Sequence, residues 1–299
     1  MPDTTPFGHV LTAMVTPMTP DGAVDEGGVR AVARHLADTA HDGVVVNGTT
    51  GESATLTSDE SIEVVRMVVD EVGDRLAVVA GVGSNSTAHS IEMAARAAEA
   101  GADSLLLVSP YYNKPTQPGL IAHCTAVADS TELPIMLYDI PGRTAVPFAT
   151  ETLVELAGHH RIVAVKDAKG DLAASIRVMA ATDYLWYSGE DALNLPLLAL
   201  GAVGVVSVTG HVTGRENAAL VEAVAAGDLV RAREIQDRVI PVIDAIMTTS
   251  QGAIMAKAAL VELGVIEHAT VRLPLLESPP AHLDILRAGL AATHAEKVA

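Results

Sequence analysis

The stretch Ile162-Val163-Ala164-Val165-Lys166 places four apolar residues in an unbroken row and ends on a lysine. A strand with one face in water alternates apolar and polar residues, whereas a strand buried on both faces is apolar throughout. The stretch is therefore typical of a parallel sheet covered by helices. It also places an amine at the carboxyl end of a buried strand.

Seven similar runs, each bounded by turn residues, occur along the chain: Val10–Val15, Val44–Asn47, Ala77–Ala80, Ser104–Val108, Ile135–Tyr138, Leu185–Tyr187 and Val203–Ser207. Most intervals between runs hold one amphipathic segment of helix length, such as Gly27–Thr39 or Ser86–Ala100. Eight such βα units predict an α/β fold, a TIM (β/α)8 barrel. The glycine-rich turn Gly81–Asn85 lacks the spacing of known nucleotide-binding loops, so nucleotide binding is not favoured.

The chain becomes helical after about Gly210. Four segments have helical patterning: His211–Ala226, Leu229–Met247, Gln251–Leu263 and Pro280–Ala292. The last three predict a C-terminal helical extension, with Gly227-Asp228 as the junction. We therefore expect a catalytic barrel over residues 1–226 and a helical bundle over residues 227–299.

The composition excludes several classes of function. With 19 Lys+Arg against 37 Asp+Glu, the net charge is −18, which repels nucleic acid and anionic lipid. Cys124 is the single cysteine and is interpreted as a small buried group on a helix. Met1–His9 has no secretory pattern, and the apolar stretch Leu195–Val208 is too short and interrupted to span a bilayer. We expect a cytoplasmic protein with neither nucleic acid nor membrane as partner.

Lys166 is the most informative candidate for catalysis. Active sites of TIM barrels lie at the carboxyl ends of the strands, which is where this lysine stands. Desolvation there lowers the pKa of the amine, and a neutral amine can attack a carbonyl to give a Schiff base. The alternative is a lysine that caps the strand and pairs outward with a carboxylate.

Polar residues at neighbouring strand ends complete the candidate site. The Tyr138 hydroxyl could move protons near an imine if Thr49 relays them. Thr50 and nearby backbone N–H groups could hold a carboxylate, and the planar fork of Arg143 suits a second one. The alternatives are a rim aromatic for Tyr138 and a surface ion pair for Arg143.

A metal-dependent aldolase is not favoured. Only His89 and His211 lie near strand ends, and they have no metal-ligand spacing. Glu52, Glu190 and Asp191 are interpreted as helix-capping residues. We expect no metal site.

Four motifs resemble the dihydrodipicolinate synthase family, which belongs with N-acetylneuraminate lyase to the Schiff-base aldolase superfamily. They are Gly48-Thr49-Thr50-Gly51-Glu52-Ser53, Tyr111-Tyr112-Asn113-Lys114-Pro115, Tyr138-Asp139-Ile140-Pro141-Gly142-Arg143-Thr144 and Val165-Lys166-Asp167. Ser188-Gly189-Glu190-Asp191 and Arg272-Leu273-Pro274 extend the resemblance over essentially the whole chain. The glycine-threonine motif marks the superfamily, whereas the double tyrosine and the arginine favour the synthase family.

The resemblance implies a reaction and a set of roles. Lys166 forms an imine with pyruvate, so no separate cofactor is needed, and the pyruvate condenses with L-aspartate-4-semialdehyde in lysine and diaminopimelate biosynthesis. Tyr138, Thr49 and Tyr112 form the proton relay. The residues implied to bind substrate are Thr50, Arg143, Gly189 and Val206.

The resemblance also implies an assembly. Tyr112 crosses a subunit interface into the neighbouring site, so a homodimer is the minimal unit. A homotetramer built as a dimer of dimers is expected.

One group of residues departs from the family pattern. Feedback-regulated relatives bind lysine with residues that match Ser53, Ala54, Asn85 and Tyr111. His89 replaces the acidic residue that pairs with the ligand ammonium, and Ser58 and Ser61 replace two histidines. Because a buried cation without a counter-charge is costly, the chain is expected to be weakly inhibited by lysine or not at all. Asp139, where many relatives carry asparagine, is a second departure.

Two other functions stay open. A sister lyase acting on pyruvate or another 2-oxo acid would share the fold and the imine lysine, since these do not fix the aldehyde. Arg143 favours a small acidic aldehyde over a sugar-acid substrate. A non-catalytic binding barrel is disfavoured because every member of the imine and relay set is present.

Overall fold

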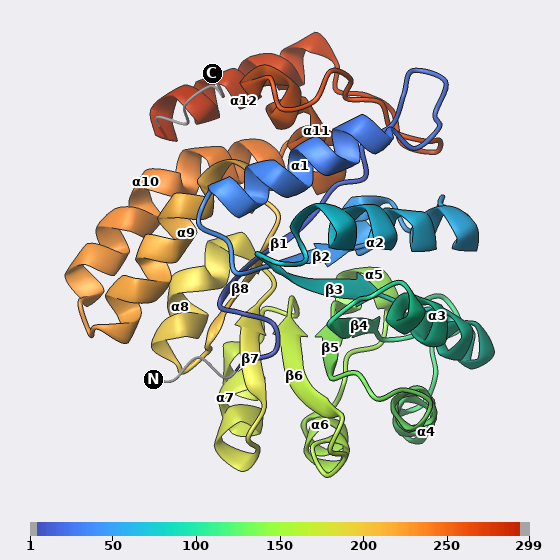
Figure 1. Cartoon of the computed structure of the whole chain (residues 1–299). Coiled ribbons are helices and arrows are strands. Elements are labelled where there is room, and N and C mark those ends of the chain that lie inside the picture. The colour runs from blue at the N-terminus through green and yellow to red at the C-terminus, as the bar shows by residue number, and fades with distance from the viewer. Residues whose placement is uncertain (1–4, 294–299) are drawn as a thin grey trace.

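Eight parallel strands close into a barrel in residues 5–293, the part of the chain that this computed structural model describes (Figure 1). Each strand pairs with the next along the chain, and the last pairs with the first. The strands are β1 Val10–Ala13, β2 Gly43–Val46, β3 Ala77–Gly81, β4 Ser104–Val108, β5 Ile135–Asp139, β6 Ile162–Asp167, β7 Leu185–Ser188 and β8 Gly204–Ser207. The predicted TIM barrel is confirmed.

Helices form the outer layer and the extension that follows it (Figure 1). They are α1 Glu26–Asp38, α2 Ser58–Val72, α3 Thr87–Glu99, α4 Gln117–Asp129, α5 Pro141–Thr144, α6 Thr150–Leu156, α7 Leu172–Ala181, α8 Asn194–Ala199, α9 Gly210–Ala225, α10 Leu229–Met247, α11 Gly252–Leu263 and α12 Pro280–Thr293. Two short 3-10 turns, η1 Thr49–Gly51 and η2 Asp191–Leu193, follow β2 and β7.

The extension packs on the barrel through α10 and α11. Helix α10 packs against α9 and α12, and α11 packs against η1. The two predicted units are residues 1–226 and 227–299. Residues 1–4, the start of the segment Met1–His9, and residues 294–299 lie outside the described residues. The division after residue 226 stays a prediction.

The barrel encloses one apolar core, and two further apolar clusters lie between the strands and the helices. Inner side chains come from alternate strand residues, for example Leu11 and Ala13 of β1 and Ala164 of β6. Phe7 packs edge-on against Tyr187, with 6.0 Å between ring centroids. Since strand side chains alternate between faces, Lys166 follows Ala164 into the barrel interior.

The structure bears on the interpretation of Cys124 and on the question of a membrane-spanning helix. Cys124 is fully buried in α4, and burial raises the pKa of its thiol to about 12, which confirms a small buried group on a helix. None of the described helices is alone long and apolar enough to cross a membrane; α10 and α11 reach that measure only as a pair, bent by 114°.

Two buried histidines, His41 and His211, hydrogen-bond to β1 or to the residues that directly follow it. The His211 Nδ1 lies 2.7 Å from the Val208 carbonyl, and its Nε2 accepts from the Val15 N–H at 3.1 Å. The His41 Nδ1 lies 3.0 Å from the Leu36 carbonyl, and its Nε2 lies 2.7 Å from the Thr12 hydroxyl. The His211 ring is therefore neutral, because its Nε2 accepts a hydrogen bond, and both of its nitrogens are engaged within the protein.

These histidines predict a loss of stability in mild acid. Burial lowers the pKa of His41 to about 4 and that of His211 to about 3. Between about pH 6.5 and 4 these two histidines therefore bind protons in the unfolded chain but stay neutral in the folded chain. At pH 5 each of them lowers the free energy of unfolding by about 2 kcal/mol. The raised pKa of Asp139, about 6, opposes part of this.

The measurement is the free energy of unfolding by urea at pH 7.5 and at pH 5. In His211→Gln the difference between the two pH values should shrink by about 2 kcal/mol. It should stay unchanged in His268→Gln, since that side chain is 35% exposed. An unchanged difference in His211→Gln would contradict the neutral, doubly engaged ring.

Candidate active site

The carboxyl ends of β5, β6 and β7 bring three polar side chains into one layer. Tyr138, Lys166 and Tyr187 are register partners on these strands. Lys166 is 3% exposed, and its Nζ lies 4.3 Å from the centroid of the Tyr138 ring. The lysine therefore points into the barrel and is not a strand cap that pairs outward.

Gly189 leaves room for the lysine stem. A Cβ at this position would lie 2.9 Å from the Lys166 Cγ and 3.0 Å from its Cε, closer than real contacts allow. The residue after β7 is therefore glycine because the Lys166 stem passes over its backbone.

The Lys166 amine is shifted toward its neutral form. Burial lowers the pKa of Lys166 to about 8, against the opposing charges of Asp191 and Glu190, while Arg143 lowers it further. About a tenth of the amine is therefore unprotonated at pH 7, far more than for an exposed lysine, and a carbonyl nucleophile requires this form.

Acidic residues near the lysine are partly engaged elsewhere. Asp191 accepts from Ser207 and from the backbone N–H groups of Val208 and Thr209, at 3.0 and 2.9 Å, and so holds the turn before α9. Glu190 and Glu52 occupy cap positions, as predicted, at the start of η2 and at the end of η1. Glu190 makes no side-chain capping hydrogen bond, and the Glu52 carboxylate lies in a buried ion pair. Burial raises the pKa of Glu190.

Tyr138 is buried beside Thr49. Burial raises the pKa of the Tyr138 hydroxyl to about 12, while Arg143 and a hydrogen bond with Thr49 act in the opposite direction. The phenol therefore remains protonated at neutral pH and can donate. The predicted neighbours Tyr138, Thr49 and Lys166 do lie together.

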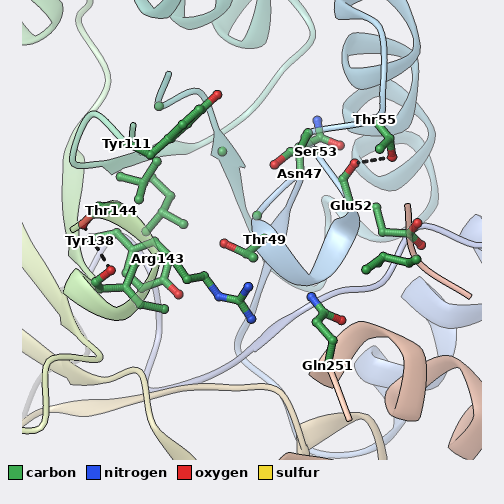
Figure 2. A pocket seen from close by; sticks show the side chains of 18 of the residues that line it. Asn47, Thr49, Glu52, Ser53, Thr55, Tyr111, Tyr138, Arg143, Thr144 and Gln251 are labelled. Carbon is green, nitrogen blue, oxygen red and sulfur yellow. Dashed lines mark hydrogen bonds between the residues drawn. The ribbon is translucent and has the colours of Figure 1, made fainter. Parts of the chain in front are cut away.

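A cavity of about 340 Å³ opens beside this group (Figure 2). Thr49, Tyr138 and Arg143 line it, whereas Lys166, Thr50, Gly189 and Val206 do not. Thr50 and Val206 are buried in η1 and β8. Arg143, in α5, is exposed and makes no ion pair with any described residue.

The two tyrosines of the double motif differ in position. Tyr111 lines the cavity, whereas Tyr112 is 87% exposed, with a φ of 73°. Within this chain Tyr112 is therefore not brought to Tyr138 and Thr49.

Some of the residues assigned to a lysine site line the cavity and others do not. Ser53, Ala54 and Tyr111 line the cavity, and Asn85 and His89 do not. The Asn85 carbonyl accepts from the Asn113 amide at 3.0 Å, and the half-exposed His89 ring lies 3.8 Å from the Glu92 carboxylate.

Asp139 is buried behind the catalytic layer. Its carboxylate lies 3.3 Å from the Lys169 ammonium and accepts from the Phe148 N–H at 3.3 Å. Burial raises the pKa of Asp139 to about 6, while Lys169 lowers it.

The C-terminal extension forms one wall of the cavity, which was not predicted from the sequence. Gln251, Pro274 and Leu275 line the cavity, and Lys257 pairs with Glu52 beneath it. A lysine inside the apolar helix Gly252–Leu263 was the available signal, because a buried charge needs a partner. Among residues 5–293, no group of three or more histidine, cysteine or acidic side chains could hold a metal ion.

A TIM barrel with a desolvated lysine at the end of β6, over a buried tyrosine, defines a lyase of the Schiff-base aldolase class. Comparison with known proteins narrows this class. The model of the Dihydrodipicolinate synthetase family matches residues 6–292. The chain belongs to this family, which confirms the resemblance read from the sequence.

Individual relatives agree. The 4-hydroxy-tetrahydrodipicolinate synthase of Kineococcus radiotolerans is 56% identical, over 96% of this chain and 93% of the relative. The 4-hydroxy-tetrahydrodipicolinate synthase 2 of Streptomyces coelicolor is 54% identical, over 96% of both. The lysine-bound structure of the Cyanidioschyzon merolae enzyme has a TM-score of 0.95 at 42% identity, covering 98% of this chain and all of that one.

Proposed function

We propose that the protein condenses pyruvate with L-aspartate-4-semialdehyde, with Lys166 as the nucleophile. The single observation that carries the residue assignment is the position of the Lys166 amine. It is buried, its Nζ lies 4.3 Å from the centroid of the Tyr138 ring, and its pKa is lowered to about 8. Attack on the pyruvate ketone forms a carbon–nitrogen double bond and releases water. The protonated imine then draws electrons from the methyl group, which loses a proton to give an enamine.

The enamine carbon attacks the aldehyde, forming a carbon–carbon bond while the aldehyde oxygen takes a proton. Tyr138, hydrogen-bonded to Thr49, is placed to deliver it. The amine of the second substrate then attacks the imine carbon, closes the ring and releases Lys166. No separate cofactor enters these steps.

The substrates are positioned by their carboxylates. Thr50 and the backbone of η1 are assigned to the carboxylate of pyruvate. The backbone at Gly189, which contacts the Lys166 stem, and the backbone at Val206 are assigned to the surroundings of the imine. Both lie outside the lining of the cavity that Arg143 borders. Arg143 lies at the cavity mouth without an ion pair to any residue between 5 and 293, so its guanidinium is available for the carboxylate of the aldehyde.

The assembly and location are part of the proposal. An aromatic side chain as exposed as Tyr112, 87%, suits burial against a second copy of the chain, whose site it completes. We assign a homotetramer built from such dimers, working in the cytoplasm.

A substrate comparison tests the proposal against the sister-lyase alternative. Rates are measured with pyruvate plus L-aspartate-4-semialdehyde, and separately with a sugar-acid substrate such as N-acetylneuraminate. We expect turnover with the first only. In Arg143→Gln the KM of the semialdehyde should rise about tenfold or more while pyruvate binding is retained. Turnover of the sugar acid alone would reject the synthase in favour of a sister lyase.

Weak feedback by lysine is a further expectation. Because His89 stands where a carboxylate would pair with the ligand ammonium, half-inhibition should require more than about 1 mM lysine at saturating pyruvate. In His89→Glu the added carboxylate should lower that concentration about tenfold, and His268→Gln serves as a surface control. Sub-millimolar inhibition of the unmodified protein would contradict this expectation.

A further inference from the structure

A buried ion pair joins the C-terminal extension to the loop that follows β2. Glu52 closes η1, and Lys257 lies within α11, 205 residues later. Their side chains are 1% and 0% exposed, and the Lys257 Nζ donates to the Glu52 Oε1. The same ammonium donates to the Thr270 carbonyl at 2.7 Å. Both side chains are therefore shielded from solvent and held in one orientation.

Arg272 holds the same loop at a second point. Its backbone N–H donates to the other Glu52 oxygen, Oε2, at 3.0 Å. Its guanidinium donates to the Thr55 carbonyl at 2.7 Å and pairs with Glu60 of α2. The loop 52–55 is thus fixed by the extension at its first residue and at its last.

The fixed loop continues directly into the proposed subsite for the pyruvate carboxylate. The Glu52 backbone has a left-handed φ of 56°, and its N–H donates to the Thr49 carbonyl at 3.2 Å. From the opposite side, the Thr16 hydroxyl donates to the Gly51 carbonyl at 2.8 Å. Figure 2 shows Glu52 and Thr49 on neighbouring parts of the loop, with Gln251 of the extension facing Thr49.

Net stability alone does not account for this arrangement. Removing two charges from water costs about as much as their attraction returns, so an apolar pair of similar volume would stabilise the fold equally well. Hydrogen bonds are directional, so an ion pair in which both carboxylate oxygens accept hydrogen bonds fixes the orientation of the carboxylate, which an apolar pair does not. Its distinctive effect is the orientation of η1.

We propose that Lys257 is a positioning residue that acts through Glu52 to place Thr49 and Thr50 for the carboxylate of the 2-oxo acid. This inference rests on the proposed function, since it assumes that Lys166 traps pyruvate in this barrel. Lys257 does not touch the substrate: the pair sets the subsite that binds it.

The experiment uses the full-length protein and removes both charges together. Lys257→Met alone would leave a buried, unpaired carboxylate and could fail to fold. The double variant Glu52→Gln/Lys257→Met avoids that charge. The matched control is Glu262→Gln/Arg287→Met, which removes the exposed ion pair of 2.8 Å between α11 and α12.

The readout is the pyruvate concentration that half-saturates trapping of the Lys166 imine by borohydride, followed by protein mass. In the double variant this concentration should rise about tenfold or more, while saturating pyruvate still modifies every chain. The KM of the semialdehyde should change by less than about threefold, and the control variant should match the unmodified protein.

Two results would overturn the inference. The first is a half-saturating pyruvate concentration within about twofold of the unmodified protein. The second is a loss of activity that follows only the fraction of folded chains, with all constants unchanged, because that indicates a purely structural pair. Failure of the unmodified protein to trap pyruvate would instead refute the proposed function.

Discussion

Lys166→Arg is expected to abolish both the pyruvate adduct and turnover. Arginine keeps the positive charge and much of the length, but its guanidinium does not lose its proton in proteins and cannot attack a ketone. Activity should fall by a factor of about 10⁴ or more. Incubation with pyruvate and borohydride, followed by mass measurement, should add one reduced pyruvate to the unmodified protein and none to the variant.

The pH dependence of trapping gives this prediction a second test. The pKa of Lys166 is lowered to about 8, chiefly by burial, so the neutral amine becomes more abundant from pH 6 to pH 8. The rate of imine formation should therefore rise across that interval and level off above it. An ordinary exposed lysine, with its pKa near 10.4, would still be gaining rate at pH 9.

Lys169→Arg is the matched control, since Lys169 follows the same strand and pairs with Asp139 at 3.3 Å. Arginine preserves that ion pair, so trapping and turnover should remain within about threefold of the unmodified protein. An adduct that persists in Lys166→Arg, or disappears only in Lys169→Arg, would move the nucleophile away from Lys166.

The barrel could be predicted because its strands are buried on both faces. Such strands contain unbroken apolar runs, and the run Ser104–Val108 coincides with β4. Where prediction and structure differ, they differ at strand ends: the run Val10–Val15 extends two residues beyond β1. Burial continues through Met14 and Val15, so hydrophobicity alone does not indicate where strand pairing stops.

The centre of the site could be predicted for a similar reason. Parallel strands place their carboxyl ends at one mouth, so Lys166 and Tyr138 had to lie close together once the barrel was recognised. The partner of Lys257 could not be read in the same way. Glu52 is 205 residues distant, and a helical lysine indicates that a carboxylate is near without indicating which one.

The environment of Asp139 was equally hidden. Its raised pKa comes from burial at the end of β5, and its partner Lys169 is on the turn after β6. Neither the burial of Asp139 nor its pairing with Lys169 can be read from the residues next to Asp139 in the sequence. Tyr112 presents the opposite case: it is exposed within one chain, and the role proposed for it requires a second copy.

Tyr138→Phe should lower kcat by a factor of about 10² to 10⁴ while preserving the pyruvate adduct. The substitution retains the ring that lies 4.3 Å from the Lys166 ammonium and removes only the hydroxyl. The pocket and the lysine should therefore remain intact, and the missing function is proton transfer. Steady-state rates and borohydride trapping at saturating pyruvate separate the two.

Tyr187→Phe is the matched control because it removes a tyrosine hydroxyl on β7, on the other side of Lys166 in the same register. That hydroxyl donates to the Gly8 carbonyl at 2.8 Å, away from the cavity. The control should lose about 1 kcal/mol of stability and little kcat. If Tyr138→Phe kept kcat within about threefold of the unmodified protein, the hydroxyl would not be the relay.

Thr49 makes the test of the relay more specific. The Tyr138 pKa of about 12 means that the phenol does not lose its proton to solvent at neutral pH, so a proton that leaves must be replaced through a hydrogen-bonded partner. If Thr49 is that partner, Thr49→Val and Tyr138→Phe interrupt the same path. The double variant should then lose no more kcat than Tyr138→Phe alone, because two breaks in one chain of transfers are not additive. Independent losses that multiply would assign the two hydroxyls to separate steps.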